Sequence, residues 1–130
     1  MRILQPPGWP RPKGYANGVE ARGRQVHVSG MIGWNAEGRF QCEDFVGQAR
    51  QALENVVAVL AEAGAGPEHV VRMTWYVLDK HEYLDAGPAL GAAYRAVMGR
   101  HYPAMSALQV AGLMEDRARV EIEVTAVVPD

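Results

Sequence analysis

The most regular pattern of apolar and polar positions runs from residue 44 to residue 64. Apolar side chains recur there every three or four residues, which predicts a helix with one buried face. The positions on that face are Phe45, Ala49, Ala52, Leu53, Val56, Leu60 and Ala63. Asp44 suits the N-cap, and Gly64 suits the position just beyond the C-terminus. Arg50 and Glu54 stand four residues apart on the polar side, where they can pair.

Other segments have the alternation or the residue content of strands. Residues 24–34 alternate between apolar and polar positions, and residues 70–79 are rich in β-branched and aromatic side chains. The last two strands are predicted at about residues 104–113 and 119–128, and a short first strand within residues 15–21. The predicted core-facing positions of the three longest strands are Val26, Val28, Val71, Met73, Trp75, Val77, Val120, Ile122, Val124 and Ala126.

A second helix is predicted from about Tyr83 or Pro88 to Met98, with Gly99 ending it. The element order is therefore β-β-α-β-α-β-β, which indicates an α+β fold with two helices packed on one face of a sheet. The opposite face mixes polar and apolar side chains, which suggests burial against another subunit. Its polar members include His27, Ser29, Thr74, Glu121 and Thr125.

Length, charge and cysteine content narrow the class of protein. A chain of 130 residues favours a single domain, with residues 1–13 as an extended, proline-rich leader. The formal net charge of −2 and the scattered arginines argue against nucleic acid as a partner. The single cysteine, Cys42, cannot form an internal disulfide and is compatible with a cytoplasmic protein. No apolar run is long enough to suggest a membrane span or a signal peptide.

An ordered set of stretches resembles the YjgF, or Rid, family of enamine and imine deaminases. The matching stretches are PKGYANGV, VHVSGMIGW, QARQALENVVAVLAEAGA, HVVRMTWYVLD, YPAMSALQV and VEIEVTAVVP, and together they cover essentially the whole chain. The resemblance implies a chorismate-mutase-like fold with a mixed sheet, and a homotrimer with clefts between its subunits. It also implies a small-molecule ligand, no metal and no organic cofactor.

The resemblance also assigns candidate site residues. Family members place an arginine after the Pro-Ala of the YPAMS stretch, where it holds the carboxylate of the substrate. In this chain that position is Met105, so the sequence departs from the family at its most diagnostic residue. Tyr15, Ser29, Gly30 and Glu121 correspond to other cleft residues, and Ala107 to a position whose backbone faces the ligand.

Imine hydrolysis requires little beyond a carboxylate that orients water and carries its proton. Glu121 is the candidate, and the alternative is a solvated or ion-paired glutamate. We expect Met105 to share an inter-subunit cleft with this acid on an adjoining strand, although a methionine that only fills a packing gap is the competing interpretation. A thioether offers no donors to a carboxylate, so unless another cation replaces the arginine, a small free 2-imino acid is disfavoured as the substrate. A larger, more apolar imine or enamine, or a carbonyl or thioester compound, fits better.

Three functions follow from these residues. The first is a cofactor-free hydrolase or deaminase of an imine, an enamine or a related reactive metabolite. The second is a trimer that retains the cleft but only binds a metabolite or stabilises a partner. The loss of the arginine favours this function more strongly here than in family members that keep the arginine. Nucleic-acid cleavage ranks last, because the acidic chain has no basic stripe interleaved with aromatic residues.

Overall fold

A four-stranded mixed sheet forms the centre of the molecule in the computed structural model, which describes residues 1–130. Its strand order is β3 (Arg24–Ile32), β6 (Val120–Val128), β4 (Val70–Val77) and β5 (Ala104–Gln109). β6 runs antiparallel to both of its neighbours, whereas β5 runs parallel to β4. The architecture confirms the predicted α+β fold with a mixed sheet.

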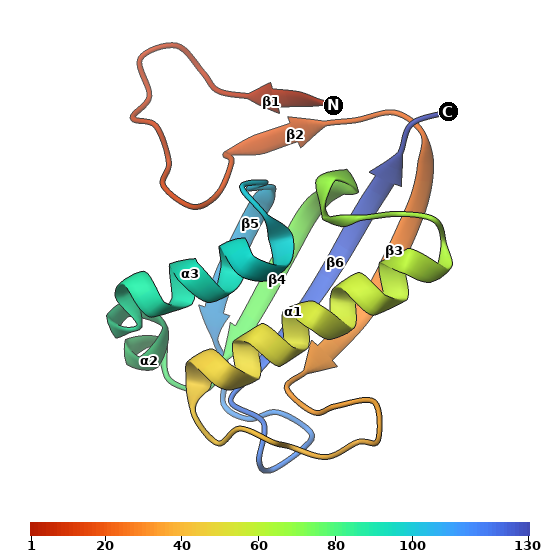
Figure 1. Cartoon of the computed structure of the whole chain (residues 1–130). Coiled ribbons are helices and arrows are strands. Elements are labelled where there is room, and N and C mark those ends of the chain that lie inside the picture. The colour runs from red at the N-terminus through yellow and green to blue at the C-terminus, as the bar shows by residue number, and fades with distance from the viewer.

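Both long helices lie across the same face of this sheet, as Figure 1 shows. They are α1 (Phe45–Glu62) and α3 (Gly87–Met98). Of the two starts predicted for the second helix, Pro88 matches α3, which also ends before Gly99 as predicted, whereas Tyr83 lies in a separate short helix, α2 (Lys80–Asp85), that precedes α3. The chain breaks between them at Gly87, whose φ of +54° is unfavourable for residues other than glycine. None of the helices combines the length and the apolar character that a membrane crossing requires.

The ends of α1 follow local sequence signals. The Asp44 side chain accepts a hydrogen bond from the backbone N–H of Gly47 at 2.9 Å, which confirms its predicted capping role. Gly64 has a φ of +68° just beyond the helix, as the C-terminal stop requires. On the exposed side, Arg50 and Glu54 form the predicted ion pair at 3.1 Å.

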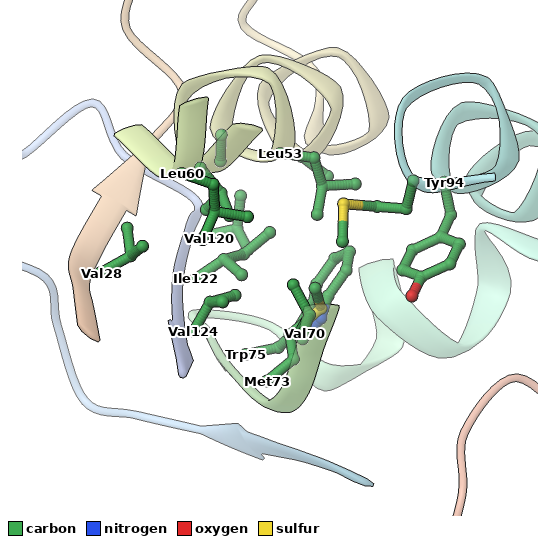
Figure 2. Close-up of a cluster of buried hydrophobic side chains, with 14 of the residues drawn as sticks. Val28, Leu53, Leu60, Val70, Met73, Trp75, Tyr94, Val120, Ile122 and Val124 are labelled. Carbon is green, nitrogen blue, oxygen red and sulfur yellow. The ribbon is translucent and has the colours of Figure 1, made fainter. Parts of the chain in front are cut away.

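The hydrophobic core fills the space between α1, α3 and the sheet (Figure 2). The labelled side chains in this view come from both helices and from three strands: Val28, Leu53, Leu60, Val70, Met73, Trp75, Tyr94, Val120, Ile122 and Val124. One predicted core position is wrong. Val70, not Val71, is fully buried, because a register irregularity between Val70 and Arg72 shifts the alternation at the start of β4.

The N-terminal segment folds back on itself. β1 (Arg2–Leu4) pairs antiparallel with β2 (Gly18–Glu20), so the leader begins with a strand of its own. Near the end of the connection between them, the backbone N–H of Ala16 donates to the carbonyl of Pro103 at 2.9 Å. This contact holds the segment beside the start of β5, which is also shorter than predicted and ends at Gln109.

Candidate functional site

The predicted site residues divide between opposite faces of the sheet. Met105 lies beside Met73 in the β4–β5 pair, and Met73 is fully buried under the helices. Residues that pair between neighbouring strands project their side chains to the same face of a sheet, so the Met105 side chain points to the helix-covered face. Glu121 lies between Val120 and Ile122, both fully buried, and therefore points to the open face. Within one chain, the two side chains do not share a cleft.

The strands that carry these residues are not neighbours either. β4 lies between β5 and β6, so the expectation that Met105 and Glu121 stand on adjoining strands is wrong. The sequence shows which residues alternate within each strand. It contains no local signal for the order of the strands, which depends on contacts between distant segments.

On the open face, Glu121 packs directly over Gly30. The register of β3 against β6 shifts between Val28 and Met31, and Gly30 lies within this irregularity. A Cβ atom at position 30 would stand 2.6 Å from Cδ and 2.8 Å from Cγ of Glu121, closer than real contacts allow. Glycine therefore provides the space that the glutamate side chain occupies, and the neighbouring Ser29 is exposed beside it.

Glu121 has no ion-pair partner and no side-chain hydrogen bond within the chain, although its side chain is half-buried. Tyr76, which pairs with Glu121 from the neighbouring strand β4, donates its hydroxyl to Oε1 of Glu123 instead, at 2.5 Å. That hydrogen bond raises the pKa of Tyr76, with smaller contributions from desolvation and from the charges of both glutamates, opposed by Arg72. Tyr76 therefore remains a neutral donor fixed on Glu123, and Glu121 is left free to contact water or a ligand.

On the helix-covered face, Met105 lines a cavity of about 380 Å³ between the sheet and helices α2 and α3. Most of the lining is apolar or aromatic, and it includes Trp75, Tyr83, Leu84, Leu90, Tyr94 and Tyr102. Burial raises the pKa of both Tyr83 and Tyr94, so both phenols stay neutral. Arg95 is the one charged side chain in this lining.

Tyr15 and Ala107 lie near this cavity without lining it. Tyr15 is 42% exposed and lines a second cavity, of about 590 Å³, together with Arg11 and Arg100. Tyr102 lines both cavities. Ala107 is exposed on β5, two residues beyond Met105, and pairs with Trp75. The structure thus groups Tyr15, Met105 and Ala107 at the β5 side of the sheet, apart from Ser29, Gly30 and Glu121.

Comparisons with known proteins agree with this fold. The sequence profile of the family described as endoribonuclease L-PSP matches residues 10–128. The crystal structure of YyfB from Yersinia pestis, of the conserved Rid protein family, superposes with a TM-score of 0.82 and 32% identity, and each chain covers 98% of the other. The chain belongs to the Rid family.

Other Rid proteins with similar sequences have an assigned activity or a bound ligand. The 2-iminobutanoate/2-iminopropanoate deaminase of Salmonella typhimurium is 35% identical over 116 residues, which span 87% of this chain and 86% of that enzyme. E. coli TdcF with bound serine superposes with a TM-score of 0.69 and 32% identity, and the match covers 98% of this chain and 99% of that one.

Arg95 and Gly91 are the site candidates that the sequence did not indicate. They stand one helical turn apart on α3, and the Nη1 atom of Arg95 lies 3.1 Å from where a Cβ of Gly91 would stand. The spacing of four residues was visible in the sequence, but nothing marked that side of the helix as facing a cavity. No group of three or more His, Cys, Asp or Glu side chains is arranged to hold a metal ion.

Proposed function

We propose that this Rid protein is a cofactor-free hydrolase that deaminates an imine or enamine, with the Glu121 carboxylate as the group that orients and deprotonates the attacking water. The observation that carries the proposal is the unpaired, half-buried carboxylate held over Gly30. The imine deaminase activity of the Salmonella and E. coli relatives supports the reaction class. A cytoplasmic setting is part of the proposal, because the lone thiol of Cys42 requires no oxidising compartment.

We further propose that the site forms between subunits of a homotrimer. Met105 and Glu121 point to opposite faces of one sheet, so a ligand that contacts both requires two copies of the chain. The open face supports this assembly, because it carries the half-buried side chains of Tyr76, Glu123 and Thr125 rather than a fully solvated polar surface. Tyr15, Met105 and Ala107 of one copy would meet Ser29, Gly30 and Glu121 of the next.

The chemistry needs only water and the carboxylate. Glu121 accepts a proton from a water molecule while the water oxygen adds to the carbon of a protonated C=N bond. The resulting carbinolamine then receives this proton from Glu121 on its nitrogen. The C–N bond breaks, ammonia leaves, and loss of the hydroxyl proton leaves a carbonyl product. The carboxylate ends each cycle ionised, so no other reactant is consumed.

The experiment compares the wild-type protein with Glu121→Gln on imines generated in solution, following carbonyl product and ammonia. The panel contains imines of small amino acids, imines of larger apolar amino acids and imines without a carboxylate. We expect the variant to lose about 100-fold or more in rate, because the amide cannot take the proton. Glu123→Gln is the matched control on the same face, since its amide oxygen can still accept from Tyr76.

Sedimentation analysis of each variant shows whether assembly is intact. Equal rates for the wild-type protein, Glu121→Gln and buffer on every imine would reject catalysis and favour the non-catalytic alternative, a Rid trimer that binds a metabolite or stabilises a partner. A monomeric wild-type protein with full activity would reject the inter-subunit site.

A further inference from the structure

Arg95 is a free cation at the Met105 cavity. Its side chain is exposed on α3 and makes no ion pair and no side-chain hydrogen bond within the chain. The guanidinium folds back over Gly91, where the missing side chain leaves room for it. The charge therefore lies along the wall of the cavity and is not neutralised by any carboxylate of the chain.

The rest of the cavity favours an apolar body. The rings of Tyr94 and Tyr102 stack with centroids 5.4 Å apart, and the Tyr94 hydroxyl is already committed to the carbonyl of His101. Met105 adds a polarizable thioether, which makes favourable contacts with aromatic rings. Trp75 adds a buried indole N–H that has no hydrogen-bond acceptor in the chain.

We propose that Arg95 supplies, from helix α3, the carboxylate contact that Met105 cannot make, and that the ligand is a carboxylate with an aromatic or bulky apolar body. A guanidinium offers paired donors that match a carboxylate, whereas the cavity floor beside it offers only apolar and aromatic surface. The ligand is thus anionic but larger than a small 2-imino acid. The inference rests on the proposed function only for the nature of the reacting group.

The test uses stable mimics of the hydrolysis product. Hydrolysis of a 2-imino acid releases a 2-oxo acid, so phenylpyruvate carries both features, pyruvate lacks the aromatic body, and phenylacetone lacks the carboxylate. Calorimetric titration of each compound measures its Kd for the wild-type protein, Arg95→Gln and Arg22→Gln. Arg22 is the matched control, because it is an exposed arginine that forms no ion pair and lines neither cavity.

We expect phenylpyruvate to bind more tightly than either partial mimic. Arg95→Gln should weaken phenylpyruvate about tenfold and leave phenylacetone unchanged, since a hydrogen bond to a charged group contributes roughly that factor. Arg22→Gln should bind all three compounds like the wild-type protein. Equal phenylpyruvate binding by Arg95→Gln and wild type, pyruvate binding as tight as that of phenylpyruvate, or no binding of any mimic would each overturn the inference.

The variant Glu121→Gln separates the two proposals, because it lacks the proposed catalytic carboxylate but keeps Arg95 and the cavity beside it. Under the inference, this variant binds phenylpyruvate like the wild-type protein. If binding depends on Arg95 but no imine is turned over, the inference stands and the proposed deaminase function fails. If imines are turned over but neither binding nor rate depends on Arg95, the function stands and the inference fails.

Discussion

The packing of Glu121 over Gly30 makes a quantitative prediction about the variant Gly30→Ala. The added methyl group would stand 2.6 Å from Cδ and 2.8 Å from Cγ of Glu121, so more than the tip of that side chain must move. Because the colliding atoms belong to one unpaired, half-buried side chain, the cost is that of holding it off its preferred rotamer, about 0.5–1.5 kcal/mol of the free energy of unfolding. Backbone strain contributes little, because Gly30 is not among the glycines with a positive φ.

A double-mutant cycle isolates the contact. If the cost of Gly30→Ala comes from the collision with Glu121, the substitution should be nearly neutral in a Glu121→Ala background. The expected coupling free energy between the two positions is therefore about 0.5–1.5 kcal/mol, measured by urea denaturation of the four proteins. Sedimentation of each protein confirms that the assemblies compared are the same.

The same displacement should affect turnover. Displacing a catalytic group by about 1 Å can reduce a rate about 100-fold. If Glu121 activates water, the turnover rate of Gly30→Ala should therefore be at least about 100-fold lower than that of the wild-type protein. Gln25→Ala is the control, because its exposed side chain lies on the same strand as Gly30 and is not part of the proposed site. A coupling free energy near zero would refute the packing argument. A coupled but fully active Gly30→Ala would refute the role of Glu121 in catalysis.

Two further substitutions test the helix-covered face. Gly91→Ala should raise the free energy of unfolding by about 0.5–1 kcal/mol, because alanine suits a helix better, yet weaken phenylpyruvate binding, because the new methyl group crowds the Arg95 guanidinium. Urea denaturation and calorimetry measure the two effects, and unchanged binding would contradict the placement of Arg95. Burial raises the pKa of Tyr94 above its ordinary value of 10.0, so the unfolded chain loses this proton first as the pH rises. Stability should therefore be fully present below pH 10 and fall above it, and Tyr94→Phe should flatten this fall in denaturation experiments between about pH 9 and 11.5.

The parts of the fold that were predictable from the sequence are those with local causes. Helix α1 has a long apolar period, an N-cap and a glycine stop within a single segment, and its limits agree with the prediction. The start of α3 was predictable from Pro88, one of the two starts that the sequence offered, whereas the early end of β5 depends on how distant segments pack. The displaced alternation at Val70 has the same origin, because a strand irregularity exists only relative to its partner strand.

For the candidate site, the sequence indicated the face of its own strand on which a single residue lies, but not how the residues are arranged relative to one another. Alternation correctly placed Glu121 on the polar side of its strand. Nothing in the sequence related that side to the side on which Met105 lies, because this relation is set by the pairing of Met105 with Met73. Arg95 is an ordinary surface arginine by its sequence context, and only the packing of α3 against the sheet brings it to the cavity.

The separation of the two residue groups has a consequence for how the protein could change its specificity. Under the two proposals, each copy of the chain carries a carboxylate that activates water on its open face and a ligand-binding cavity under its helices, with the sheet between them. A substitution at Met105 or Arg95 alters the cavity without touching the packing of Glu121 on Gly30. Exchanging a cation on a strand for one on a helix therefore changes which part of a ligand is held, while the carboxylate that would perform the reaction keeps its position.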